Sequence, residues 1–189
     1  MLLISYYFPP IGGAGAQRPV KLARHLLDLG YSAVVVTGPG QTGGMWTPPD
    51  PSLSLEIPPE VEVIRVPGPE PASRGGIRTR IDRFARIETE WTSWWRNGVL
   101  AAAAAARLEG IDAIYTIMSP FASAEPSLAL ARAHGIGWIA DLGDPWALDE
   151  MMVYPTGVHR RLELARMRRL LGSAAAVVMS TPEAARQVV

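Results

Sequence analysis

The chain has no cysteine, no excess of charge of either sign and few histidines. The absence of cysteine excludes disulfide bonds and thiolate metal sites. The three histidines, His25, His134 and His159, are scattered and do not match the ligand spacing of a metal centre. A formal net charge of zero argues against whole-molecule attraction to nucleic acid. We therefore expect neither a bound metal ion nor a nucleic-acid partner.

Two further absences bear on location. No apolar run reaches the roughly 20 residues that a bilayer-spanning helix needs. Met1 leads straight into an apolar segment, without the basic region that opens a signal peptide. A cytoplasmic protein is therefore the expectation. With 189 residues, 48% of them hydrophobic and 19% charged, the chain has the composition and length of one well-buried globular domain.

Short apolar runs alternate with helical patterns along the chain. The predicted strands are Leu2–Tyr7, Ala33–Thr37, Val61–Val66, Ala113–Ile117, Gly137–Asp141 and Ala175–Met179. The predicted helices are about Ala16–Leu29, Arg78–Arg107, Ser123–His134 and His159–Leu171, with a last one that opens at Pro182. This alternation predicts the α/β class, with a Rossmann-like, doubly wound parallel sheet in one domain. Ser180, Pro182 and Glu183 predict a capping-box start for the last helix.

A glycine cluster follows the first predicted strand. Gly12, Gly13 and Gly15 stand between a Pro-Pro turn and an amphipathic helix. Glycine has no Cβ to block close approach, and the free N–H groups at a helix N-terminus bind anions, usually phosphates. Arg18, in the first turn, could add a positive charge for a phosphate or orient the loop. The alternatives are that the glycines only form a tight turn and that Arg18 makes a surface salt bridge.

Other nucleotide loops fit the cluster poorly. Arg18 stands where a dinucleotide fingerprint needs its third glycine. The second predicted strand ends in Val36-Thr37-Gly38, without the carboxylate that binds a ribose. No Gly-Lys-Ser/Thr is present, which excludes a Walker loop. A nicotinamide- or flavin-dependent oxidoreductase is therefore disfavoured.

Several segments together resemble the N-terminal domain of the family-4 glycosyltransferases of the GT-B fold. These are YYFPPIGGAGAQR with the LARHLLDLGY helix, Pro48–Val66, the Ser119-Pro120 step and Trp138–Trp146 (WIADLGDPW). The last is similar to the family's signature "pWvaDfRDpW". The resemblance covers essentially the whole chain. One departure is Gly143, which replaces the arginine usual before Asp-Pro-Trp.

The resemblance implies transfer of a sugar from a nucleotide-sugar to an acceptor hydroxyl, with retention and without a cofactor or metal. It implies roles for seven residues: donor-phosphate contact by Gly12, Gly13, Gly15 and Arg18, acceptor contact by Ser119 and Trp146, and catalysis by Asp144. An Asp144 carboxylate near the reacting sugar could accept hydrogen bonds or a proton. Asp144 could instead cap the following turn, and Trp146 could be a buried aromatic.

The carboxyl ends of parallel strands form the usual ligand edge of a doubly wound sheet. The glycine loop, Ser119-Pro120 and Asp141–Trp146 all follow predicted strands at that edge. We therefore expect them to converge on one cleft. Asp141 is expected to anchor its turn rather than to take part in the chemistry.

Relatives in the resembled family have two Rossmann-like domains, and the C-terminal one holds most of the nucleotide. Residues 1–189 would thus form the acceptor-side domain, with the donor-binding domain absent and supplied in cis or in trans. The isolated chain is then expected to be inactive. The alternative is a non-catalytic partner domain that pairs with a separate donor-binding chain or binds a lipid-linked acceptor.

The segment Arg78–Arg107 combines arginines with tryptophans. Such a helix can dock at an anionic membrane surface, which would place the protein at the inner face of the membrane. The alternative is a helix that buries its apolar stripe on the sheet while its arginines stay solvated.

Overall fold

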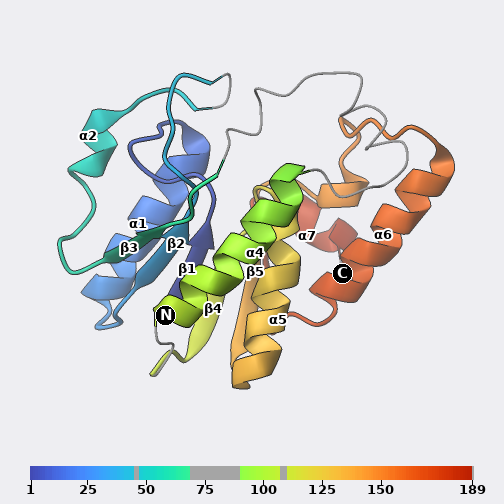
Figure 1. Cartoon of the computed structure of the whole chain (residues 1–189). Coiled ribbons are helices and arrows are strands. Elements are labelled where there is room, and N and C mark those ends of the chain that lie inside the picture. The colour runs from blue at the N-terminus through green and yellow to red at the C-terminus, as the bar shows by residue number, and fades with distance from the viewer. Residues whose placement is uncertain (45–46, 69–89, 107–109, 189) are drawn as a thin grey trace.

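The computed structural model describes residues 1–44, 47–68, 90–106 and 110–188, the side chains of residues 90–93 excepted. These residues form a six-stranded sheet of order β3-β2-β1-β4-β5-β6 (Figure 1). The strands are β1 (Leu2–Ser5), β2 (Val34–Thr37), β3 (Glu62–Arg65), β4 (Ala113–Ile117), β5 (Gly137–Leu142) and β6 (Ala176–Met179). Every neighbouring pair is parallel. The prediction of a Rossmann-like α/β fold is confirmed.

Helices connect these strands. They are α1 (Ala14–Asp28), α2 (Pro51–Ser54), α4 (Glu90–Ala105), α5 (Ala124–His134), α6 (Gly157–Leu171) and α7 (Pro182–Val188). Two short 3-10 helices, η2 (Phe121–Ser123) and η3 (Trp146–Leu148), follow β4 and β5. Among the described residues, none of these helices combines the length and apolar character needed to cross a bilayer.

The predicted Arg78–Arg107 helix appears as α4, between Glu90 and Ala105. Residues 78–89, which carry most of the basic residues behind the membrane prediction, lie outside the described residues. Within α4, Trp95 is fully buried, and its indole N–H donates to the Ser123 hydroxyl at 2.9 Å. That part of the helix therefore packs on the sheet, as the alternative interpretation expects.

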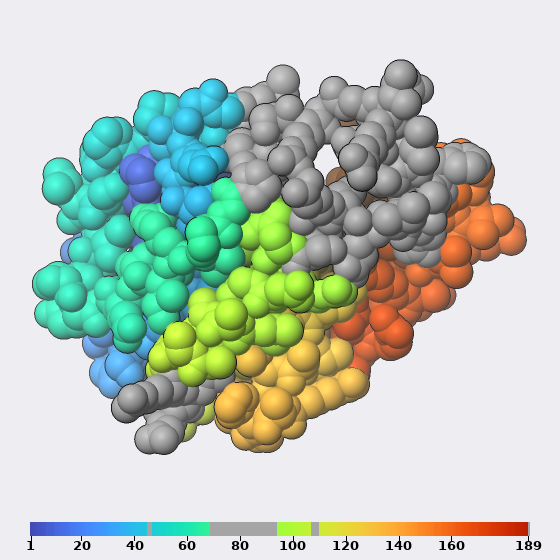
Figure 2. All heavy atoms as spheres, viewed as in Figure 1, coloured from blue at the N-terminus to red at the C-terminus, as the bar shows by residue number. Residues whose placement is uncertain are grey.

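Each face of the sheet carries its own core, because successive strand residues point to opposite faces. On one face, α1 packs Val20 and Ala23 in the same cluster as Leu3 and Val35. On the other face, α4, α5 and α6 cover a larger cluster that includes Leu2, Ile4, Ile114, Trp138 and Trp146. Helices α4 and α5 lie side by side in front of the strands in Figure 1 and form a continuous surface in Figure 2.

The start of α7 differs from the predicted capping box. The Thr181 hydroxyl, not that of Ser180, accepts the Ala184 N–H, at 3.1 Å. The Ser180 hydroxyl donates instead to the Gly143 carbonyl at 2.8 Å. The prediction was wrong because Ser180 has a tertiary acceptor in the turn after β5, which the sequence alone does not reveal.

Candidate functional site at the carboxyl edge of the sheet

The loop between β1 and α1 is fixed by contacts with the segment that follows β2. The Gly12 N–H donates to the Pro48 carbonyl at 2.7 Å. A Cβ on Gly12 would lie only 2.6 Å from Asp50 Cβ, so a larger residue would force the two segments apart. Gly12 is thus required by packing. Its N–H is already engaged, and the expectation of a bare amide does not hold at this position.

Gly13 is the N-cap of α1 and has φ 87° and ψ 174°. Residues with a Cβ rarely adopt this backbone conformation. The Gly13 carbonyl accepts the Ala16 N–H at 3.1 Å and the Gln17 N–H at 3.2 Å. This conformation turns the chain sharply into the helix and begins its hydrogen bonding.

The first two amides of α1 are exposed to solvent. Ala14 and Gly15 are both exposed, and the structure gives their N–H groups no acceptor among the residues it describes. No side chain caps this end of α1. A Cβ on Gly15 would meet the Tyr7 side chain at an ordinary 3.5 Å, so neither packing nor conformation requires glycine there. The N-terminus of α1 therefore presents bare N–H groups and partial positive charge to solvent.

Arg18 crosses from α1 to the buried carboxylate of Asp141 on β5. Its Nη2 lies 3.0 Å from Asp141 Oδ1, with the Arg18 side chain 38% exposed and that of Asp141 fully buried. The Oδ1 atom is buried and accepts no aligned hydrogen bond from the described residues, so the contact is a charge pair. The Tyr115 hydroxyl, from β4, donates to Asp141 Oδ2 at 2.9 Å. Arg18 is thus paired, but with a buried partner rather than in the surface salt bridge considered as the alternative.

The electrostatics of this triad follow from burial. Desolvation raises the pKa of Asp141, while the Tyr115 hydrogen bond and the Arg18 charge act in the opposite direction and only partly offset it. Burial, with the Asp141 carboxylate, also raises the pKa of Tyr115, so its hydroxyl stays protonated and remains a donor. The Asp141 carbonyl accepts the Met118 N–H at 2.8 Å, which continues the pairing of β4 with β5.

Ser119 and Asp144 are exposed residues of the turns after β4 and β5. The Asp144 carbonyl accepts the Trp146 N–H at 2.8 Å, whereas its side chain caps nothing: the N-cap of η3 is Pro145. The capping role considered for Asp144 is therefore not seen. Gly143 is also exposed, and a Cβ there would meet no atom of the described residues within 4 Å. The carboxylate of Asp144 thus stands at an open position.

Trp146 lies beneath this edge, with only 1% of its surface exposed. Its ring stacks on Phe121 with centroids 4.9 Å apart and planes 4° from parallel. Its indole N–H donates to Glu163 Oε1 at 2.9 Å. The Arg166 guanidinium lies 5.8 Å from the ring centroid and donates to both Glu125, at 2.6 Å, and Glu163, at 3.1 Å. We call these five residues the Trp146 cluster; in it Trp146 is the buried aromatic that the alternative interpretation describes.

The structure brings the candidate residues to one edge. Strands β1, β4 and β5 are neighbours and parallel, so the segments that follow them share the carboxyl edge. The Arg18–Asp141 pair joins the helix after the glycine loop to the end of β5. Tyr115 is a site residue that was not predicted; its one signal in the sequence is a tyrosine that stands with Thr116 among the apolar residues of β4. Among the described residues no cluster of three potential metal ligands occurs.

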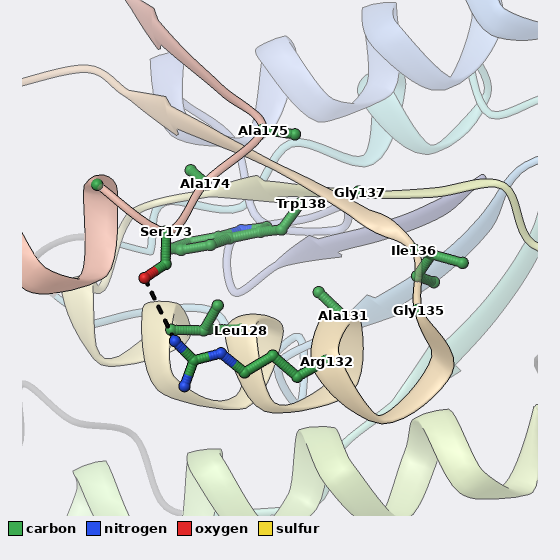
Figure 3. A pocket seen from close by; sticks show the side chains of 11 residues that line it. Leu128, Ala131, Arg132, Gly135, Ile136, Gly137, Trp138, Ser173, Ala174 and Ala175 are labelled. Carbon is green, nitrogen blue, oxygen red and sulfur yellow. Dashed lines mark hydrogen bonds between the residues drawn. The ribbon is translucent and has the colours of Figure 1, made fainter.

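A surface pocket of about 420 Å³ lies at the other end of the sheet (Figure 3). It is lined by the C-terminal ends of α5 and α6 and by the start of β5, with Trp138 in its wall. Arg132 bridges it by donating to the Ser173 hydroxyl at 3.3 Å. Ligands of open α/β sheets bind at the carboxyl ends of the strands, so this pocket is not the candidate site.

The sequence model of the glycosyl transferase 4-like domain matches residues 13–189, and the chain belongs to that family. The resemblance identified from the motifs is thereby confirmed. No curated protein matches the sequence. The structure of apo UGT2 from Phytolacca americana aligns with a TM-score of 0.47 and 17% identity, over 76% of this chain. The chain spans 29% of the length of that protein.

Proposed function

We propose that the chain forms one wall of a cleft in which a sugar passes from a nucleotide-sugar to an acceptor hydroxyl, with retention. The observation that carries this proposal is the exposed N-terminus of α1, with bare amides at Ala14 and Gly15 and with Arg18 one turn further along. Family membership supports the reaction class, and the position of the loop at the carboxyl edge supports ligand binding there. No cofactor or metal enters the reaction.

The donor diphosphate would lie against the N-terminus of α1. Its negative charge grows as the bond to the sugar breaks, and exposed amides, the helix dipole and a guanidinium stabilise that charge. Gly13 sets the direction of the helix, and Gly12 fixes the loop against Pro48. Gly15, which the fold does not need as glycine, leaves room for the phosphate oxygens.

The acceptor would approach from the turns after β4 and β5. Asp144 is the candidate catalytic residue, because its exposed carboxylate can accept a hydrogen bond or a proton from the acceptor hydroxyl. The Ser119 hydroxyl can orient the acceptor. Because Trp146 is buried, it would support acceptor binding indirectly, by holding this turn in place, and would not contact the acceptor itself. The open space at Gly143 leaves room for an acceptor beside Asp144.

The remaining expectations complete the proposal. A donor-binding domain, in cis or in trans, supplies most of the nucleotide contacts, so the chain by itself is inactive. The protein works in the cytoplasm, with peripheral contact at the inner membrane face. Of the segment Arg78–Arg107, the part before α4 would make this contact, because Trp95 within α4 is buried. The second candidate function is a non-catalytic domain that pairs with a donor-binding chain or holds a lipid-linked acceptor. The exposed carboxyl edge of the sheet is the surface on which either partner would bind.

A titration of the ¹⁵N-labelled chain tests the site. Adding UDP or GDP should shift the amide signals of Gly13, Ala14 and Gly15, and leave that of Gly135, at the far end of the sheet, unchanged. Shifts confined to the pocket beside Trp138, or none up to about 20 mM nucleotide, would contradict the proposal.

Sugar transfer by the purified chain alone would overturn its expected inactivity. In a complex with a donor-binding domain, Asp144→Asn should lower turnover about 100-fold or more, whereas a non-catalytic domain would tolerate the change.

A further inference from the structure

The triad of Arg18, Asp141 and Tyr115 has a feature that an ordinary structural ion pair lacks. Its acid is fully buried, while the Arg18 side chain is 38% exposed. Among the described residues, Asp141 is the ion-pair partner of Arg18, with Arg18 Nη2 3.0 Å from Asp141 Oδ1. The other N–H donors of the guanidinium fork remain for a ligand, since arginine has five.

Helix geometry directs Arg18 toward the bare amides. Ala14 and Arg18 are four residues apart and therefore lie on the same face of α1. Helical side chains lean toward the N-terminus, so Arg18 extends over the turn that begins with Ala14. Without a restraint, the long Arg18 side chain would sample many rotamers, and a ligand would have to order it.

A buried aspartate at position 141 is difficult to explain by its contribution to the stability of the fold alone. A buried carboxylate loses its hydration, and replacing a buried ion pair with well-packed hydrophobic residues of similar volume is often neutral or stabilising. The raised pKa of Asp141 agrees: burial outweighs both the Tyr115 hydrogen bond and the Arg18 charge. The carboxylate is thus better explained by what it does to Arg18 than by what it adds to stability.

We propose that Asp141, braced by Tyr115, is a positioning residue that holds Arg18 so that its guanidinium and the Ala14 and Gly15 amides bind one phosphate group together. The inference rests on the proposed function, since it assigns how the same loop takes up a diphosphate. Neither Asp141 nor Tyr115 touches the phosphate. Both act through Arg18, whose side chain they hold in place at the edge of the sheet before the phosphate binds.

The competing effect of Asp141 has the opposite sign. Asp141→Asn removes a negative charge from the neighbourhood of an anion site, and by simple electrostatics it should tighten phosphate binding. If Asp141 positions Arg18, the same substitution should weaken binding. The asparagine oxygen can still accept the Tyr115 hydroxyl, but its amide no longer attracts the guanidinium.

The experiment is a titration of the ¹⁵N-labelled chain with inorganic pyrophosphate, followed at the Gly15 amide and the Arg18 Nε–H. Asp141→Asn should raise the dissociation constant about threefold to tenfold, and Arg18→Ala about tenfold. The double variant should match Arg18→Ala, because Asp141 acts only through Arg18. Arg24→Ala removes an exposed charge from the same helix and should stay within about twofold of the unmodified chain.

Tyr115→Phe provides a second, milder variant in case Asp141→Asn does not fold. It should weaken binding about twofold to threefold and broaden or shift the Arg18 Nε–H signal in the free protein. Equal or tighter binding by both Asp141→Asn and Tyr115→Phe, with pyrophosphate still shifting Gly15, would overturn the positioning role and leave the proposed function standing. No binding by the unmodified chain up to about 20 mM would overturn both.

Discussion

Two arginines meet carboxylates at the same edge of the sheet, on opposite faces. Arg18, on the face that carries α1, pairs with one acid that is fully buried, while its own side chain is 38% exposed. Arg166, on the other face, pairs with Glu125 and Glu163, and all three side chains are mostly but not fully buried, at 27%, 27% and 15% exposure.

The difference in pairing indicates a ligand-binding role for Arg18 and a structural role for Arg166. Arg166 has both sides occupied, because it donates to two carboxylates from different helices and lies over the Trp146 ring. It joins α5, η3 and α6. Arg18 is held on one side only, and its remaining donors lie at the open edge. The predictions below test whether the Trp146 cluster is architectural and the Arg18 triad functional.

The largest effect is expected in the Trp146 cluster. Trp146→Ala removes a fully buried ring that stacks on Phe121, and should lower the free energy of unfolding by about 3–5 kcal/mol, measured by urea denaturation. Tyr31→Ala, at a position with 52% exposure, is the control and should stay within about 0.5 kcal/mol. A loss below about 1 kcal/mol at Trp146 would show that the stack is not formed.

The next effect separates two glycines of the loop. Gly13→Ala forces a residue with a Cβ into φ 87° and should lower stability by about 1–3 kcal/mol. Gly15→Ala should raise stability by about 0.5–1 kcal/mol, because alanine is the better helix former and its Cβ meets only ordinary contacts. The same Gly15→Ala variant should weaken pyrophosphate binding. Thermal unfolding and the titration together check the pair, and a Gly15→Ala variant that binds normally would remove Gly15 from the site.

A smaller effect is expected at Arg166. Arg166→Ala leaves Glu125 and Glu163 without their shared cation in a partly buried place, and should lower stability by about 1–2 kcal/mol. Pyrophosphate binding should not change, because Arg166 lies on the face opposite α1. If this variant binds pyrophosphate more weakly while its ¹⁵N spectrum shows an intact fold, Arg166 is not purely structural and the distinction from Arg18 is wrong.

The smallest effect concerns pH. Because the pKa of Asp141 is raised in the folded protein, the folded state holds this proton more tightly than the unfolded state. Its contribution to stability is therefore greatest in acid and is lost as the pH rises through the raised pKa. Relative to Asp141→Asn, the unmodified protein should lose stability between acid and neutral pH. Urea denaturation at several pH values measures the difference, and a difference that grows in the other direction contradicts the raised pKa.

Much of the fold could be predicted from the sequence because its signals are local. Valine-rich strands such as Ala33–Thr37 and the glycine turn before α1 depend on neighbouring residues alone. The Arg18–Asp141 contact could not be predicted in this way, because it requires knowing that β1, β4 and β5 are adjacent. For the same reason the capping box predicted at Ser180 is wrong. A hydroxyl three residues before a glutamate suggests such a box, and only the fold reveals that the Ser180 hydroxyl donates to the Gly143 carbonyl. The burial of Trp146 could not be predicted, because a tryptophan after a strand is equally compatible with a core position and with a ligand contact.

The Ser180 hydroxyl also couples two parts of the chain mechanically. It joins the end of β6 to the carbonyl of Gly143, the residue before Asp144. The backbone just before Asp144 is therefore tied to the connection into α7. The turn that carries the candidate catalytic carboxylate is thus held from two directions, by the pairing of β5 with β6 and by the hydroxyl of the residue that follows β6.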